Sequence, residues 1–379
     1  MSEKKPSVEK KEVAKKASST KKTAVKKTTT STKKPVAKSS SPQKKDLMHW
    51  TEIKEKMSKF PSPSDIAKEN GLKPIIEIKD LKKNYGKLKV LKGVNFDIYE
   101  TQDVGVIGAN GAGKSTLSEI VAQVKESTSG EIKYSWGDTK RQISRGMGIQ
   151  FQESTYPEGY KIIDLIQFYL DVNGITVVEE DENDKEFLKK IECDKCKKPF
   201  FEKVKPSSPT TKHRCKRRNC GYEHEYNVAD KFITRSHFDS LLKVFQVDGI
   251  THKMANAVSG GQQQRFNILL GVLHQPKFLI LDEVSTGLDV ESRTDIKQFV
   301  KELMEENGGT LYLVTHNMDE IEFLSDRLVT VDAGKIVDDV MISQIHEIGL
   351  DVSKYVDSFF AYRDEKYRKE GRSKNDQSE

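Results

Sequence analysis

Three patterns in the sequence predict an α/β fold with an antiparallel β subdomain. Residues 75–85 and 90–99 alternate apolar and polar side chains, which is typical of antiparallel strands with one buried face. A short apolar run at 104–107 leads into a glycine-rich loop, and a second run at 277–283 ends in two carboxylates. Short apolar runs between polar turns indicate strands that are buried on both faces, as in the parallel sheets of α/β proteins.

The loop at 108–115 reads GANGAGKS and fits the phosphate-binding pattern G-x-x-x-x-G-K-[ST]. Its glycines allow backbone N–H groups to curl around phosphate oxygens, and the helix that follows adds its positive N-terminal end. Lys114 would place a charge beside the β- and γ-phosphates, and Ser115 would offer its hydroxyl to Mg²⁺. The order of strand, loop and helix favours this P-loop over an ordinary glycine-rich turn.

The run KFLILDE at 277–283 predicts the strand that completes the site. Open α/β sheets bind ligands at the carboxyl ends of their strands, which is where Asp282 and Glu283 stand. We expect Asp282 to support Mg²⁺ and Glu283 to orient or deprotonate the attacking water.

A second anion site is predicted at VSGGQQQR, where Ser259, Gly260 and Gly261 precede a helical run. One nucleotide does not need two phosphate sites from a single chain. Two chains facing head to tail would use both.

With these motifs, roughly residues 75–340 resemble the ABC ATPases. The resemblance implies an ABC-type P-loop ATPase core with a helical arm, which binds ATP with Mg²⁺ and hydrolyses the ATP. It places Tyr85 against adenine, Gln152 on Mg²⁺, His316 on the γ-phosphate, and Asp289 at the end of a loop that crosses the dimer interface. The implied catalytic residues are therefore Glu283, His316 and Gln152, and the Mg²⁺ ligands are Ser115, Gln152 and Asp282. The implied nucleotide-binding residues are Tyr85, Gly108, Asn110, Gly111, Ala112, Gly113, Lys114, Ser115, Thr116, Ser259, Gly260 and Gly261.

The sequence departs from the family pattern at Val284, where the family usually has proline. The change loosens the turn after Glu283 but removes no chemical group, so we expect genuine hydrolysis.

The helical arm contains an insertion at 175–229 that holds every cysteine of the chain. Cys193 and Cys196 form a C-x₂-C pair, and Cys215 and Cys220 form a C-x₄-C pair eighteen residues later. Four thiols in two close pairs predict a closed structural Zn²⁺ site, and the segment resembles a zinc ribbon. Two alternatives remain: His213 or His224 replaces one cysteine, or the thiols hold no metal.

The insertion also has a basic face, which could meet nucleic acid, lipid headgroups or an acidic protein loop, or could simply surround a stabilising metal clip. Its members are Lys197, Lys198, Lys216, Arg217 and Arg218.

The ends of the chain differ from its centre in composition. Residues 1–46 form a Lys-rich segment that we expect to be disordered; up to residue 45 it has fifteen Lys and three acidic residues, in a chain whose net charge is +6. Residues 47–73 are expected to be a linker with an amphipathic helix, 74–340 the ATPase domain, and 341–379 a C-terminal helix with a charged tail. Leu47, Trp50, Ile53 and Met57 would share one face of the amphipathic helix, which either packs on the neighbouring domain or lies in a membrane interface.

The function predicted from these features is that of the ATPase subunit of an ABC transporter, which dimerises with itself or a relative and drives an integral membrane permease. The sequence has no secretory signal and no apolar stretch of about 20 residues, so we expect a cytoplasmic protein on the inner face of the cell membrane. The Lys-rich segment could attract anionic lipid or nucleic acid. The alternative function is that of a soluble ABC ATPase acting on DNA or the ribosome, with the zinc module contacting nucleic acid.

Overall fold

The computed structural model describes residues 48–151, 156–182, 184–208, 210–217, 220–228, 232–283 and 288–369. The predictions for residues 1–46, for Gln152 and for Val284 therefore lie outside the described residues.

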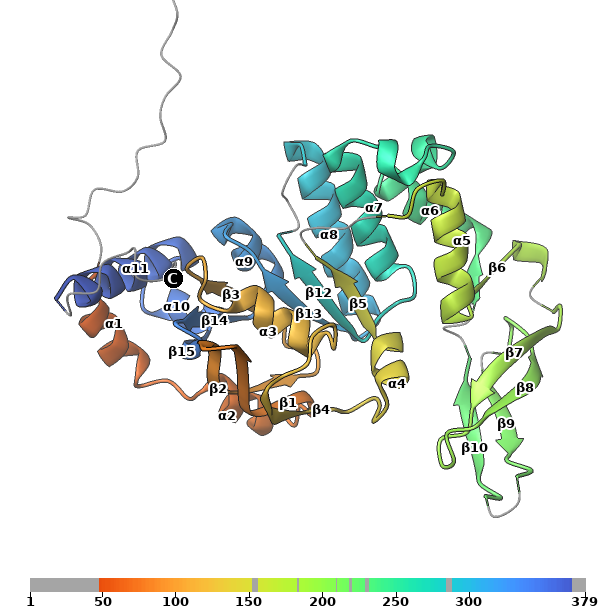
Figure 1. Cartoon of the computed structure of the whole chain (residues 1–379), viewed down its shortest axis with the longest axis horizontal. Coiled ribbons are helices and arrows are strands. Elements are labelled where there is room, and N and C mark those ends of the chain that lie inside the picture. The colour runs from red at the N-terminus through yellow and green to blue at the C-terminus, as the bar shows by residue number, and fades with distance from the viewer. Residues whose placement is uncertain are drawn as a thin grey trace, which may run out of the picture. The chain divides into compact units, whose positions relative to one another are not determined.

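A six-stranded sheet forms the centre of the fold, in the order β15-β14-β3-β13-β12-β5 (Figure 1). All neighbouring strands are parallel except β14 and β15, which form an antiparallel pair at one edge. Strands β3, β12 and β13 are buried along their whole length, as their uniformly apolar sequences predict. The strands are β3 (Val104–Gly108), β5 (Met147–Gln150), β12 (Phe278–Asp282), β13 (Thr310–Val314), β14 (Arg327–Asp332) and β15 (Lys335–Met341).

Each face of this sheet belongs to a different hydrophobic core. Along β12, Leu279 and Leu281 join a core with α7, α8 and α9, whereas Phe278 and Ile280 join a core with α3 and the antiparallel subdomain. The period-2 alternation of strand side chains thus divides one apolar run between two cores. The helices on these faces are α3 (Lys114–Val121), α7 (Gly260–Val272), α8 (Val290–Glu306) and α9 (Met318–Leu324), and α4 (Lys140–Arg145) precedes β5.

The antiparallel subdomain is a three-stranded sheet in the order β2-β1-β4. Strands β1 (Pro74–Tyr85) and β2 (Leu88–Tyr99) pair antiparallel, which confirms the prediction from their alternating patterns. Strand β4 (Ser129–Tyr134) pairs with the other edge of β1.

The helical arm is built from α5 (Ile162–Asn173) and α6 (Arg235–Val244) with two short 3₁₀ turns, Asp248–Ile250 and Ala255–Ala257. Before α6, Phe232–Thr234 is strand β11, which pairs parallel with β6 (Thr176–Val178). Helix α6 begins at Arg235 because Thr234 is its N-cap, and the Thr234 hydroxyl oxygen accepts from the His237 N–H.

Residues 187–227, which we call the cysteine module, consist of two antiparallel hairpins. Cys193 and Cys196 lie in the turn between the strands of the first hairpin, and Cys215 and Cys220 lie between those of the second. The hairpins are β7 (Phe187–Glu192) with β8 (Pro199–Val204), and β9 (Thr210–Arg214) with β10 (Glu223–Asn227); a 3₁₀ turn, Glu180–Glu182, precedes them.

The amphipathic helix near the N-terminus, α1 (Trp50–Met57), packs against the C-terminal helix α11 (Val352–Lys369). The Trp50 ring meets the edges of Tyr355 and Phe359 at centroid distances of 5.2 and 5.3 Å. Trp50, Ile53 and Met57 are buried, so the apolar face is covered by protein, as the packing alternative predicts; Leu47 lies outside the described residues. Helices α2 (Pro63–Glu69) and α10 (Ile342–Glu347) complete this end.

No helix within the described part of the chain is long and apolar enough to cross a membrane.

Candidate functional site

The loop after β3 folds around the ammonium group of Lys114. Lys114 is the first residue of α3, and its Nζ donates to the carbonyl oxygens of Gly108 and Ala109 at 2.9 and 3.3 Å. Burial lowers the pKa of Lys114, while the nearby carboxylates of Asp282 and Glu283 oppose that shift. A buried cation at the N-terminal end of a helix is complementary to an anionic group such as a phosphate.

Two glycines allow this loop to fit against the sheet. Gly113, the N-cap of α3, has φ +104°, a backbone conformation that side chains rarely adopt. A Cβ on Gly108 would lie 2.2 Å from the carbonyl oxygen of Val331, so any side chain there would push the loop away from β14.

The loop opens into a cavity of about 780 Å³, which we call the nucleotide cavity. It brings together residues of four predicted motifs that lie far apart in the sequence, from Tyr85 to His316. Gly108 and Ala112 do not line it and instead shape the loop from behind. Predicted site residues in its wall are Tyr85, Asn110, Gly111, Gly113, Lys114, Ser115, Thr116, Asp282, Glu283 and His316.

Part of the wall was not predicted from the sequence. Four residues of β2 and the turn at Ala333 and Gly334 also line the cavity; those of β2 are Leu88, Lys89, Val90 and Lys92. Gly334 holds these parts together, because its carbonyl accepts from the Lys92 N–H at 2.9 Å and its own N–H donates to the Ala112 carbonyl at 3.0 Å. A glycine between two predicted strands was the available signal, but many turns have one.

The two carboxylates at the end of β12 lie in different environments. Asp282 is 5% exposed, and burial, with the Glu283 charge beside it, raises its pKa to about 6 against the attraction of Lys114. Glu283 has φ +55°, a strained conformation for a residue with a side chain. Its backbone is fixed by a 2.8 Å hydrogen bond from its N–H to the Val314 carbonyl, and its carbonyl accepts from Gln264 at 3.2 Å.

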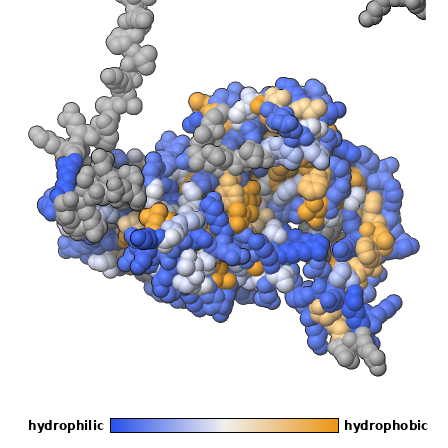
Figure 2. All heavy atoms as spheres, in the orientation of Figure 1, coloured by the Kyte–Doolittle hydropathy of each residue, from blue (hydrophilic) through white to orange (hydrophobic). Residues whose placement is uncertain are grey.

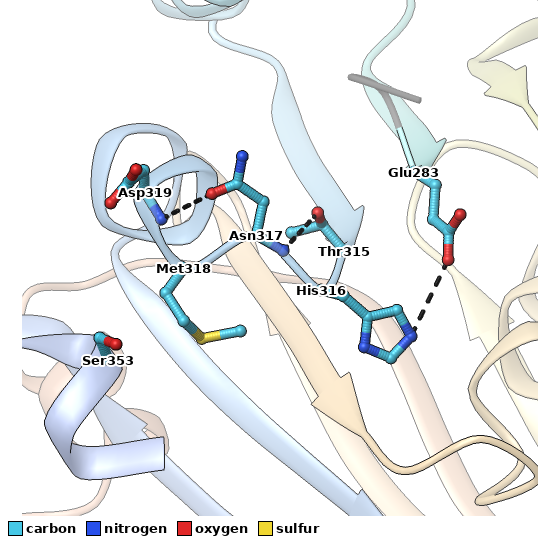
Figure 3. Close-up of a pocket in the computed structure, with 7 residues that line it drawn as sticks. All are labelled: Glu283, Thr315, His316, Asn317, Met318, Asp319 and Ser353. Carbon is cyan, nitrogen blue, oxygen red and sulfur yellow. Dashed lines mark hydrogen bonds and ion pairs between the residues drawn. The ribbon is translucent and has the colours of Figure 1, made fainter. Parts of the chain in front are cut away.

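His316 points toward Glu283 from the loop after β13 (Figure 3). The two side chains are 3.8 Å apart, from His316 Nε2 to Glu283 Oε1. Burial, aided by the Lys114 charge and opposed by Glu283, lowers the pKa of His316, which favours the neutral imidazole at pH 7.

A buried network positions the loop of His316, and no motif in the sequence indicates it. Thr315 Oγ1 donates to Glu320 Oε2 at 2.7 Å and accepts from the Asn317 N–H at 3.0 Å. Asn317 also caps α9 by accepting from the Asp319 N–H at 3.0 Å. Glu320 is fully buried, so this network fixes both ends of the loop.

The second predicted anion site lies elsewhere on the chain. Ser259 is the N-cap of α7 and exchanges hydrogen bonds with Gln262, and Gly260 faces open space. We call residues 259–261 the signature segment. Among the described residues, none of this segment lines the nucleotide cavity.

Asp289 is tied to the helix that follows the signature segment. It caps α8 by accepting from the Ser292 N–H at 2.9 Å, and its carboxylate lies 3.5 Å from Arg265 of α7. Arg265 also donates to Ser292 Oγ at 3.1 Å. These contacts link the predicted interface loop to the predicted second anion site.

The four cysteines of the cysteine module converge on one point. All their sulfur atoms lie within 4.8 Å of one another, with Cys193 and Cys220 at 3.7 Å and Cys196 and Cys215 at 3.8 Å. His213 is engaged elsewhere: its Nδ1 lies 2.8 Å from Glu202, and its ring stacks on Phe200. This arrangement favours the four-thiol set over the alternative in which His213 replaces a cysteine.

Comparison with known families gives a match to the ABC transporter family over residues 91–286. The chain belongs to the ABC transporter family. The resemblance stated from the motifs is thereby confirmed, and ATP with Mg²⁺ is the expected ligand set for an ABC ATPase. The zinc-ribbon part of the prediction is not tested by this match.

Several ABC transporter proteins are similar to this chain. The sulfate/thiosulfate import ATP-binding protein CysA of Mannheimia succiniciproducens is 27% identical over 69% of this chain and 60% of its own. The bacitracin transport ATP-binding protein BcrA of Enterococcus faecalis is 24% identical over 72% of this chain and 71% of its own. The chain thus spans about 60% of the length of the CysA relatives.

Solved ABC structures share the fold. An ATP-binding subunit of an ABC transporter has a TM-score of 0.53 at 20% identity, covering 75% of this chain and 99% of its own. The ATP-binding cassette MJ0796, described as a post-hydrolysis dimer with ADP and phosphate, has a TM-score of 0.51 at 21% identity, covering 70% of this chain and 98% of its own. These likenesses confirm the ABC-type α/β core.

Proposed function

We propose that this chain is the ATP-binding and ATP-hydrolysing subunit of an ABC transporter, and that it drives a separate membrane permease. The observation that supports this most is the nucleotide cavity, where Lys114, Asp282, Glu283 and His316 meet. The similar proteins described as transport subunits favour transport over the alternative of a soluble ATPase acting on DNA or the ribosome.

In this proposal each residue of the cavity has one task. Lys114 and the N–H groups of its loop hold the β- and γ-phosphates, while Tyr85 faces the adenine. Ser115, Asp282 and Gln152 hold Mg²⁺, which would supply positive charge to the phosphates. Glu283 accepts a proton from the water whose oxygen attacks the γ-phosphorus, and ADP leaves with the electron pair of the broken P–O bond. Neutral His316 donates a hydrogen bond to the γ-phosphate.

A second chain completes the site. Because the signature segment stands apart from the nucleotide cavity, we propose that it acts on the nucleotide of a partner ATPase chain, either a second copy or a relative, with Asp289 at the interface. Ser259→Arg should lower turnover at least about a hundredfold, or about 2.7 kcal/mol, while ATP binding to the monomer is unchanged. An equal loss of monomer ATP affinity would contradict the arrangement.

The permease is the partner to identify first. Affinity capture of the full chain from detergent-solubilised membranes, followed by mass spectrometry, should recover an integral membrane protein with several spans. Capture of nucleic-acid-binding or ribosomal proteins alone would support the alternative function. The proposed location is the inner face of the cell membrane.

The cysteine cluster fits Zn²⁺, and we propose that it is a structural zinc site. Zn–S bonds of about 2.3 Å in a tetrahedron place sulfur atoms about 3.8 Å apart. The separations of 3.7 and 3.8 Å match that geometry. Metal analysis of protein prepared without chelator should give about one zinc per chain, and protein without metal would contradict the site.

The Lys-rich N-terminal segment is proposed to attract anionic surfaces. Each Lys close to an anionic membrane contributes up to about 1 kcal/mol, and salt screens this attraction. Deletion of residues 1–45 should weaken salt-sensitive binding to vesicles or DNA and leave ATP hydrolysis unchanged. Loss of hydrolysis on deletion would show that the segment belongs to the catalytic unit.

A further inference from the structure

The first hairpin of the cysteine module has one covered face. Phe200 stacks on His213 at 3.8 Å and meets the edge of Tyr226 at 5.5 Å, so one side of β8 rests on the second hairpin. On β7, Phe187 meets Phe232 at 5.3 Å, and the Lys189 ammonium bonds to Thr176. These contacts explain the apolar residues on the covered face.

The opposite face bears two large apolar side chains that nothing in the described chain covers. Leu188 is 65% exposed and Phe201 is 63% exposed. Strand alternation predicts polar residues on the open face of such a hairpin, so both side chains depart from the pattern. Orange, hydrophobic side chains reach the surface of this part of the chain among blue ones (Figure 2).

The strand register combines these two residues with two lysines. Leu188 lies opposite Lys203, and Lys190 lies opposite Phe201. Because neighbouring pairs two residues apart share a face, the apolar side chains occupy one diagonal and the lysines the other. We call these four residues the open hairpin face. Lys203 also lies 3.3 Å from Glu186, a pair in which both side chains are exposed.

The charge of the cysteine module indicates the kind of partner. Residues 187–227 contain twelve Lys and Arg against five Asp and Glu. Even four thiolates with one divalent cation would leave the module positive. A complementary partner is therefore anionic.

We propose that the open hairpin face is a membrane-contact surface for anionic phospholipid. Lysine stems can lie along apolar surface with their ammonium groups at the phosphates, while Leu188 and Phe201 enter the acyl boundary below. A single-stranded nucleic acid would use the Phe201 ring for stacking, but it offers no apolar environment to an exposed leucine. The charged residues beside Leu188 and Phe201 are lysines, which bind phosphate as point charges and lack the planar fork that reads bases. Glu192 lies further along the same face of β7 and is paired with Arg141 and Arg145 of α4.

The test uses the full chain and vesicles of phosphatidylcholine with phosphatidylserine. Phe201→Trp places a fluorophore on the open hairpin face, and brominated acyl chains quench indole that enters the bilayer. The unsubstituted chain, with Trp50 and Trp136, gives the background. We expect quenching of Phe201→Trp beyond that background, and quenching equal to the background would overturn the proposal.

A second measurement distinguishes membrane binding by the open hairpin face from membrane binding by the Lys-rich segment. At about 0.5 M salt the Debye length is about 4 Å, so attraction by the segment is largely screened. Under that condition Leu188→Ser with Phe201→Ser should partition at least about tenfold more weakly than the unsubstituted chain. The matched control is Val337→Ser, which changes a 46% exposed residue of β15 and should leave partitioning unchanged.

Two outcomes would overturn the proposal in this arm. One is equal partitioning of the double variant and the Val337→Ser control. The other is a double variant that loses binding to a single-stranded oligonucleotide while its vesicle binding is unchanged, which would assign the face to nucleic acid. An unchanged metal content and unchanged protease resistance of residues 187–227 show that the module of the variants is folded.

Discussion

The nucleotide core and the cysteine module are held together in different ways. In the core, β3, β12 and β13 are buried from end to end, and two hydrophobic cores cover the two faces of the sheet. In the module, β9 has no buried residue, and β7 and β8 have one each, Lys189 and Val204. In the module, the four cysteines meet at one point and take the place of the apolar contacts that hold the core together.

Because of this difference, the two regions should be kept ordered by different means. The core can hold Glu283 in a strained backbone conformation because Asp282 before it is buried in β12, and because Val314 and Gln264 form hydrogen bonds with its own N–H and carbonyl. The module has too little buried apolar surface to order itself, so its order should depend on bound metal.

The largest effect should come from the core. Glu283→Gln should lower ATP turnover by about 10²–10⁴-fold and leave ATP affinity unchanged, because it removes a proton acceptor and keeps the shape. Steady-state hydrolysis and nucleotide binding measure the two quantities. Asp319→Asn, which changes another carboxylate lining the pocket shared by Glu283 and His316, should stay within about twofold of the unsubstituted chain. Turnover of Glu283→Gln near that control would mean that Glu283 is not the base.

Loss of the metal should disorder the cysteine module and leave the core folded. Replacing Cys193 and Cys196 by Ser should release the metal and expose residues 187–227 to proteases. ATP affinity and hydrolysis should persist, since no cysteine lines the nucleotide cavity among the described residues. Metal analysis, limited proteolysis and ATP binding test the three parts. Simultaneous loss of ATP binding would show that the two regions fold as one unit.

A smaller effect should appear as a dependence of stability on pH. Folding raises the pKa of Asp282 from 3.8 to about 6. Between pH 4 and pH 6 the folded state therefore keeps a proton that the unfolded state loses, and the free energy of unfolding falls as pH rises. Above pH 6 both states have lost the proton, and this loss of stability stays constant. Asp282→Asn removes this loss. Without nucleotide, this variant should melt about 2 °C higher at pH 8, with a smaller gain at pH 4.5. Equal gains at both pH values would exclude ionisation as the cause.

The smallest effect should come from the contact between the two regions. Glu192, next to Cys193, lies 3.6 and 3.7 Å from the guanidinium groups of Arg141 and Arg145 on α4. Glu192→Gln should weaken the attachment of the module by less than about 1 kcal/mol, seen as a slightly faster proteolysis of residues 187–227. Glu186→Gln, which breaks an exposed pair with Lys203 of the module, is the control. A large loss of ATP turnover would contradict the view that this contact is weak.

The same contrast explains what could be predicted from the sequence. The P-loop, the strand ending in Asp282 and Glu283, and the helix after Ser259 are local patterns, and their spacing alone identified them. The network of Thr315, Asn317 and Glu320 and the wall at Gly334 join residues that no local pattern connects, so only the folded chain brings them to the site.

In the module, the cysteine spacing predicted convergence of the four thiols, but the strands around them gave a weak pattern. The exposed Leu188 and Phe201 read as ordinary strand residues in the sequence. Their exposure follows from the register of one hairpin, which local composition does not define.

Mixing two inactive variants of the full chain tests directly whether two copies share each ATP site. Lys114→Ala removes the P-loop charge, Ser259→Arg blocks the signature segment, and each alone should hydrolyse almost no ATP. If the site forms between two copies, a mixed dimer has one intact site, so an equal mixture should recover about a quarter of the unsubstituted activity. A mixture no more active than either variant alone would contradict the claim that ATP is hydrolysed between two copies of this chain.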